Sequence, residues 1–340
     1  MQRHIIPVCA LAACLTAAPA KAQTTYQRPP ESLAQLVDAP RTPLVLLSPT
    51  RESMLFLQPP SVPSIADLSA PELRLAGRRI NPRNHGPSRS SGYVSLGFKA
   101  FGEDAQRMVR GIPEGARIGN VRFSPDGRHI AFTVELTDRI EIYVASVETA
   151  VARRQTDRAV NAASPGAPYR WVSDSQTLLV KAVPAGRGAA PEVPLVPRGP
   201  VVQENLGQTS PARTYQDLLQ NSFDEELFSY YMESEVLRIS LSGETHRVGE
   251  AGLITNVAPS PDGEHVLVES IQKPFSYLVP YYRFPRTIAV YDVDGRLVRT
   301  VASLPLAESV PVRPGSVPTG PRSVSSVSYT HLTLPTKRIV

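Results

Sequence analysis

The sequence predicts an all-β chain built from repeated antiparallel sheets, because one turn phrase recurs along its 340 residues. The phrase is complete at Ser124-Pro125-Asp126-Gly127 and again at Ser260-Pro261-Asp262-Gly263, and each copy runs into an apolar stretch that opens on a histidine. Two degenerate copies keep the frame, at Ser48-Pro49-Thr50 and at residues 171–175. Further strand-like stretches lie at residues 140–147, 236–241 and 288–293. Arrays of such units are typical of β-propellers, whose blades are four-stranded sheets.

Each copy of the phrase is expected to form a tight turn before a strand. Proline's fixed φ suits the second position of a type I turn, and Asp and Gly tolerate the positions after it. Counted from their serines, Ser48, Ser124, Ser173 and Ser260, the copies are 76, 49 and 87 residues apart, whereas one blade takes roughly 40 to 50 residues. We therefore expect about five or six blades, some of them irregular, in an incomplete propeller.

Other segments depart from the β pattern. Apolar residues between positions 214 and 234 recur at three- and four-residue steps, which predicts a helical insertion of one or two helices. Residues 32–37 are expected to form a short helix. Residues 76–91 and 184–200 are rich in Gly, Pro and polar residues, so we expect surface loops there.

The first 22 residues have the pattern of a secretion signal. Arg3 and His4 precede an apolar stretch, and Ala20-Lys21-Ala22 fits the small-x-small cleavage pattern. We expect cleavage after Ala22 and a periplasmic or secreted protein. An alternative is a lipoprotein anchored through Cys14, because Leu11-Ala12-Ala13-Cys14 resembles a lipoprotein box. No other stretch approaches the roughly 20 apolar residues of a membrane span.

The formal net charge of +5 is concentrated at the two chain ends. The leader carries Arg3 and Lys21, the last thirteen residues carry Lys337 and Arg338, and neither segment has an acidic residue. Without them 32 basic residues face 31 acidic ones, so we expect no nucleic-acid partner. Both cysteines lie in the leader, so a chain cut after Ala22 has no disulfide and is stabilised by packing alone.

Several short motifs resemble the propeller part of the prolyl oligopeptidase family, and within it the glutamyl endopeptidases. They occur in order between residues 71 and 322 and are more specific than the turn phrase. The motifs are Leu73-Arg74-Leu75-Ala76-Gly77, Pro197-Arg198-Gly199-Pro200, Gln203-Glu204-Asn205, Arg213-Thr214-Tyr215-Gln216-Asp217-Leu218-Leu219, Phe228-Ser229-Tyr230-Tyr231, Pro274-Phe275-Ser276-Tyr277, Arg283-Phe284-Pro285, Pro305-Leu306-Ala307-Glu308 and Gly320-Pro321-Arg322.

The resemblance implies an exported serine endopeptidase that hydrolyses peptides after glutamate, with the propeller gating access to a following α/β-hydrolase domain. That domain carries a Ser-Asp-His triad in the family, and its G-x-S-x-G elbow is missing from this sequence. We therefore expect residues 23–325 to be a truncated propeller domain, inactive by itself, with no catalytic residue and no cofactor. Residues 326–340 resemble a translated sequencing adapter. For the function of the chain, the alternative to a peptidase fragment is a stand-alone exported propeller that binds a ligand without catalysis.

An enzyme that cuts after glutamate needs a cation for the substrate carboxylate, since arginine pairs with carboxylates in a bidentate way. Four arginines lie in the motif-rich segments and are candidates, namely Arg198, Arg213, Arg283 and Arg286. A structural or solvated role is the alternative for each. Glu225 and Glu226 are expected on a solvated helix face. Neither a serine-histidine pair nor a tight set of metal ligands is visible around any histidine, so we expect no metal site.

Overall fold

A computed structural model describes residues 29–195, 215–308, 320–321 and 324–325. The chain divides into two compact units, Met1–Ala39 and Pro40–Val340, and each is described by itself. In the first unit, α1 (Glu31–Asp38) confirms the predicted short helix. The leader, its cleavage site and Cys14 lie outside the described residues. Among the helices that the structure describes, none is long and apolar enough to cross a membrane.

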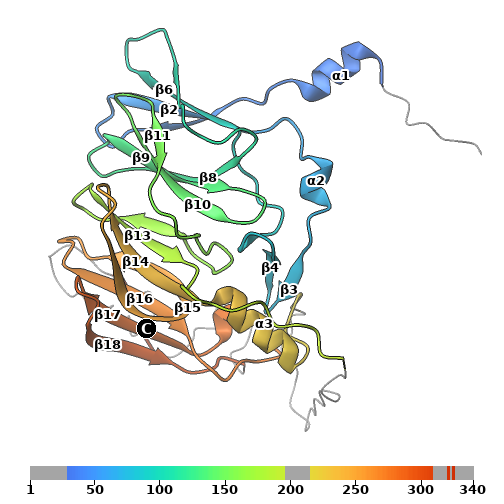
Figure 1. Cartoon of the computed structure of the whole chain (residues 1–340), viewed down its shortest axis with the longest axis vertical. Coiled ribbons are helices and arrows are strands. Elements are labelled where there is room, and N and C mark those ends of the chain that lie inside the picture. Colours follow the sequence, from blue (N-terminus) through green and yellow to red (C-terminus); the bar gives the residue numbers. More distant parts are fainter. Residues whose placement is uncertain (1–28, 196–214, 309–319, 322–323, 326–340) are drawn as a thin grey trace, which may run out of the picture. The chain divides into compact units, whose positions relative to one another are not determined.

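The second unit is mostly β, and its antiparallel strands form two four-stranded sheets, one seven-stranded sheet and one small three-stranded sheet (Figure 1). The seven-stranded sheet divides at its long middle strand into two sets of four strands, so we number four sheets of the repeat. Sheet 1 has the order β1 (Leu44–Leu47), β2 (Ser53–Gln58), β6 (Ser95–Ala100), β7 (Arg107–Met108). Sheet 2 contains β8 (Arg117–Phe123), β9 (His129–Glu135), β10 (Ile140–Ser146) and β11 (Ala152–Arg154). Sheet 3 contains β12 (Tyr169–Trp171), β13 (Thr177–Ala182), β14 (Ser234–Ser240) and the first part of β15 (Thr245–Pro259). Sheet 4 contains the second part of β15, then β16 (His265–Ile271), β17 (Arg286–Asp292) and β18 (Leu297–Leu304).

All four copies of the turn phrase are tight turns between the first and second strands of a sheet. In each, the fourth residue donates its backbone N–H to the carbonyl of the first, as in Gly127 to Ser124 at 2.9 Å and Gly263 to Ser260 at 3.0 Å. That fourth residue has a positive φ in every copy, which glycine adopts without strain. The degenerate copies place Arg51 and Ser175 there, at φ 59° and 58°. The prediction of turn-and-strand units is therefore confirmed.

Neighbouring sheets pack face to face through three clusters of buried apolar side chains. Leu57 of sheet 1 and Phe132 of sheet 2 belong to the first, and Ile142 of sheet 2 and Val180 of sheet 3 belong to the second. The third joins Val236 of sheet 3 to residues of β15 and β16 in sheet 4. Sheets that follow one another in sequence and bury both faces against their neighbours are the blades of an incomplete β-propeller.

The described residues hold four blades, whereas five or six were expected for the chain. The long gaps between turn phrases are filled by insertions within blades. One lies between β2 and β6 and holds α2 (Ile65–Leu68), β3 (Leu73–Leu75), β4 (Arg78–Asn81) and β5 (Gly86–Pro87). The other lies between β13 and β14 and holds α3 (Ser222–Met232).

Residues 76–91 are not a simple surface loop, as the sequence suggested. They continue β3 through a turn at Ala76 and Gly77 into β4 and β5, which form a small three-stranded sheet. Ile80 in β4 is fully buried and, with Leu75 and Ala76, anchors the sheet. The described part of the other predicted loop, residues 184–195, contains no helix or strand.

Candidate functional site

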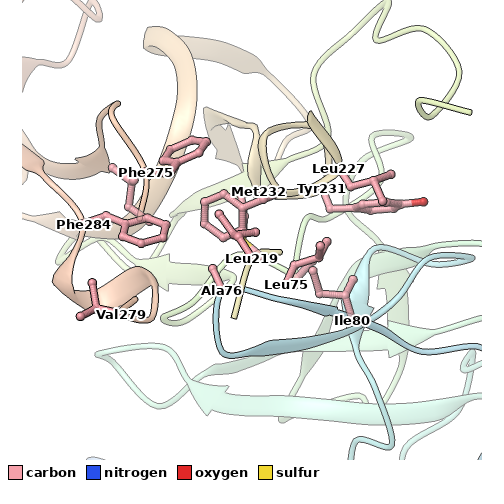
Figure 2. Close-up of a cluster of buried hydrophobic side chains, with 13 residues drawn as sticks. Leu75, Ala76, Ile80, Leu219, Leu227, Tyr231, Met232, Phe275, Val279 and Phe284 are labelled. Atoms are coloured by element: carbon pink, nitrogen blue, oxygen red, sulfur yellow. The ribbon is translucent and has the colours of Figure 1, made fainter. Parts of the chain in front are cut away.

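Six of the sequence motifs meet in one buried cluster, which we call the helical lobe. It is built from α3, the β3–β5 sheet, residues 215–219 and residues 271–285, which include the short helix η1 (Tyr281–Arg283). Figure 2 shows its apolar side chains pointing toward one another. The labelled members are Leu75, Ala76, Ile80, Leu219, Leu227, Tyr231, Met232, Phe275, Val279 and Phe284. The motifs that carry the resemblance therefore pack against one another although they are far apart in sequence.

Helix α3 is the element around which the lobe forms. Its start is capped by Asn221, whose side-chain oxygen accepts a hydrogen bond from the backbone N–H of Asp224 at 2.9 Å. The helix begins later than the apolar pattern suggested, at Ser222, and the described residues before it are not helical. Phe228 is fully buried and meets Phe275 and Phe284 edge to face, at centroid distances of 5.2 and 5.7 Å. Such aromatic pairs add to the energy of apolar burial.

Backbone hydrogen bonds join the lobe across the same distant segments. The Gly77 N–H donates to the carbonyl of Asp217 at 2.7 Å, and the Tyr281 N–H donates to the carbonyl of Ala76 at 2.9 Å. A Cβ on Gly77 would lie 2.8 Å from Cβ of Pro280, and its φ is 81°. The tight approach at Gly77 therefore requires glycine.

Arg283, one of the four predicted carboxylate-binding arginines, lies at the edge of this lobe. Its Nη1 donates to the carbonyl of Ala307 at 3.0 Å, and its guanidinium carbon is 5.9 Å from the ring centre of Tyr215. The same two residues also form a backbone hydrogen bond, in which the Ala307 N–H donates to the Arg283 carbonyl at 2.9 Å. These contacts tie two motif segments together.

Arg286 belongs to sheet 4 and not to the lobe core. Its Nη1 donates to Oε1 of Glu269 on the neighbouring strand β16 at 2.7 Å, while its Nε is buried without a hydrogen-bond partner among the described residues. Arg286 is therefore held by a strand of sheet 4, whereas Arg283 is held by the 305–308 segment. Arg198 and Arg213 lie outside the described residues.

Glu225 is not on a solvated face, as the helical pattern suggested. It is half-buried, and its carboxylate accepts a hydrogen bond from the hydroxyl of Tyr277. That hydrogen bond to the carboxylate, together with burial, raises the pKa of Tyr277 to about 12. The pair connects α3 to a motif of the 274–277 segment, so Glu225 contributes to the packing of the lobe.

A second polar cluster had no signal in the sequence and is formed by His85, Arg187 and, from α3, Tyr230. Nη2 of Arg187 lies 3.1 Å from Nδ1 of His85, and the guanidinium carbon lies 4.2 Å from the ring centre of Tyr230. Burial, and to a lesser extent the Arg187 charge, lowers the pKa of His85 to about 4, so the imidazole is neutral at pH 7. The cluster connects residues 184–190 to helix α3.

The remaining described histidines lie apart from the lobe. His129 and His265 begin β9 and β16, as expected for one position of the repeat, and His246 in β15 contacts Glu244 at 3.0 Å. Asp262, Glu264 and His265 place their ligand atoms within 4.8 Å of one another, but both acids are exposed and Asp262 already accepts the Ser260 hydroxyl. This turn therefore supports no metal assignment.

No family model matches the chain. Two curated proteins named "Probable glutamyl endopeptidase, chloroplastic" are similar to it. The protein from Oryza sativa subsp. japonica is 37% identical over 313 residues, covering 88% of this chain and 33% of that protein. The protein from Arabidopsis thaliana is 39% identical over 315 residues, covering 89% of this chain and 32% of that protein. The chain thus spans about one third of the length of these relatives and is a β-propeller related to peptidases.

Solved structures with a similar fold are more distant. Pyrococcus horikoshii acylaminoacyl peptidase is 12% identical with a TM-score of 0.40, covering 74% of this chain and 31% of that chain. The β-propeller domain of the Trilobed protease from Pyrococcus furiosus is 13% identical with a TM-score of 0.37, covering 77% of this chain and 58% of that chain.

Proposed function

We propose that this chain is the N-terminal propeller part of an exported serine endopeptidase that cleaves peptides after glutamate. The observation that carries the proposal is 37–39% identity to two proteins named probable glutamyl endopeptidase, across nearly nine tenths of this chain. The helical lobe supports it, because the residues that carry the resemblance pack together there and would be constrained as a group.

In this proposal the catalytic groups belong to a hydrolase domain that follows the propeller. A serine would attack the peptide carbonyl, a histidine would take and return the proton, and an oxyanion hole would stabilise the tetrahedral intermediate. The propeller would filter peptides by size. Arg198, Arg213, Arg283 and Arg286 stay candidates for binding the glutamate at the cleavage point. Export by a signal ending at Ala22, or anchoring through Cys14, is part of the same proposal.

The gene sequence downstream of Arg322 tests the proposal first. A G-x-S-x-G motif in the same reading frame, placed between a predicted strand and helix, is the expected result. An early native stop codon would instead favour a stand-alone propeller that binds a ligand.

Labelling of the complete gene product with a fluorophosphonate probe is the second test. We expect one labelled serine, located by mass spectrometry beyond residue 322 and within that motif. Labelling inside residues 40–308 would contradict the proposed division between propeller and catalytic domain.

A further inference from the structure

Two arginines occupy the same repeat position in neighbouring blades. Arg122 on β8 lies two positions before Ser124, the first turn residue of sheet 2. Arg170 on β12 lies two positions before Val172, the first turn residue of sheet 3. The equivalence follows from the closing hydrogen bonds, Ser124 N–H to the His129 carbonyl at 2.8 Å and Val172 N–H to the Thr177 carbonyl at 2.9 Å. By the same rule, sheets 1 and 4 have apolar residues at this position, Leu46 and Ala258.

Side-chain hydrogen bonds hold these two first strands beside each other. Nε1 of Trp171 donates to the carbonyl of Arg122 at 3.3 Å, and the Tyr169 hydroxyl contacts the carbonyls of Asn120 and Ala131. Arg170 lies between Tyr169 and Trp171 in sequence. The hydrogen bonds of Tyr169 and Trp171 thus place the two arginines on adjoining strands of neighbouring blades.

Neither guanidinium has a hydrogen bond or an ion pair with any residue that the structure describes. Some other arginines of the sheets do have such partners. Arg139 and Arg154 share Glu141, and Arg286 pairs with Glu269. Arg122 is exposed, whereas Arg170 is half-buried, and a half-buried cation without an anion is unfavourable.

Arg122 and Lys181 lie close enough to Arg170 for their charges to interact with it. Burial and the charge of Arg122 lower the pKa of Arg170. Burial, followed by the charges of Arg78 and Arg170, lowers the pKa of Lys181 to about 7. The ammonium of Lys181 contacts the carbonyls of Ser164 and Pro165, so its donors are used within the protein. Lys181 is buried, whereas Arg122 is exposed and Arg170 half-buried, so these two arginines can meet a ligand from solvent.

We propose that Arg122 and Arg170 form a carboxylate-binding pair for acidic side chains of a peptide. Two guanidinium groups on adjoining strands offer the planar, bidentate donors that carboxylates accept best. The apolar residues at the equivalent positions of sheets 1 and 4 restrict the site to one or two carboxylates, which does not suit a nucleic-acid backbone. That the ligand is a peptide rests on the proposed function, whereas its acidity follows from the arginines.

Binding to the 340-residue chain tests the pair without requiring catalysis, so failure of the proposed enzyme activity would leave the result interpretable. The probe is a fluorescein-labelled hexapeptide with three glutamates, compared with its glutamine version by fluorescence anisotropy at low and high salt. We expect the wild-type chain to prefer the glutamate peptide, and the preference to weaken with salt. Equal binding of both peptides, or no binding of either, would overturn the proposal.

The variant R122Q/R170Q should weaken binding of the glutamate peptide about tenfold and leave the glutamine peptide unaffected. The control R128Q/R153Q removes two exposed charges from sheet 2 and should stay within about twofold of wild type. Arg122→Glu alone, on an exposed side chain, gives the same expected loss if the double variant does not fold. Equal losses in the control and the pair variants, or displacement of the peptide by a single-stranded oligonucleotide at lower concentration, would refute the assignment.

Discussion

Gly77 shows how one residue determines the geometry of the helical lobe. Its φ of 81° lets β3 turn into β4, and the space beside its Cα is taken by Pro280. A ring carbon cannot swing aside as the end of a flexible side chain can. Both the backbone conformation and the close approach therefore depend on the missing Cβ.

We expect Gly77→Ala to lower the free energy of unfolding by more than the cost of a positive φ alone, which is about 1–2 kcal/mol. Gly102→Ala is the matched control, because Gly102 has a φ of 85° and no atom within 4 Å of a built Cβ. Urea unfolding of both variants measures the difference. A Gly77→Ala variant no less stable than Gly102→Ala would contradict the packing described for Pro280.

Lys181 is a buried lysine whose charged form is destabilised by its surroundings. The side chain is 1% exposed, and burial with the neighbouring arginines lowers its pKa from 10.5 to about 7. Between pH 7 and 10.5 the unfolded chain keeps this proton while the folded chain releases it. The free energy of unfolding contributed by Lys181 therefore rises with pH in that window.

We expect Lys181→Met to remove this rise. Urea midpoints of wild type and variant at pH 7, 8.5 and 9.5 measure it, and the difference between the two proteins cancels the titration of other groups. Wild type should gain relative to the variant as pH increases. A constant difference across the three pH values would show that Lys181 stays protonated in the folded chain.

At the scale of elements, each repeated turn contacts the equivalent turn of the next blade. The Asp126 N–H donates to Oγ of Ser175 at 3.0 Å, and a Cβ on Gly263 would lie 3.2 Å from a methyl group of Val172. A Cβ on Gly127 would lie 3.4 Å from Thr50. The phrase that revealed the fold in the sequence thus also links each blade to the next.

Ser175→Ala should therefore lower the free energy of unfolding by about 1 kcal/mol, because the Asp126 N–H loses its partner in the next blade. Ser173→Ala, in the same turn but exposed, should change it by less than about 0.5 kcal/mol. Chemical denaturation curves distinguish the two. Equal effects of both substitutions would mean that the contact between turns does not stabilise the blades.

The turns and the helix of the second insertion could be predicted from the sequence because their signals are local, whereas the sheet of the first insertion could not. Ala76-Gly77 is a weak hairpin signal, and the β3–β5 sheet is anchored by Ile80 within a basic stretch. Glu225 and Arg187 had the composition of solvated residues. Their partners, Tyr277 and His85, lie 52 and 102 residues away in the sequence, so no local pattern could reveal these contacts.

At the scale of the whole molecule, four blades, a helical lobe and the similarity to glutamyl endopeptidases support one account. The fold class followed from repeats, and the relation to peptidases followed from motifs that the lobe packs together. Of the four arginines predicted to bind a carboxylate, Arg283 and Arg286 are held by different elements, and Arg198 and Arg213 lie outside the described residues, so that site stays a prediction. The unpartnered pair of Arg122 and Arg170 had no signal in the sequence beyond its place in the repeat.

The central claim is that this propeller serves a peptidase whose catalytic groups follow it in the gene product. Mass spectrometry of a peptide with one internal glutamate, incubated separately with the complete gene product and with the 340-residue chain, tests it most directly. We predict cleavage after the glutamate by the complete product and an intact peptide with the shorter chain. An intact peptide with both proteins, or cleavage by the 340-residue chain itself, would contradict the account.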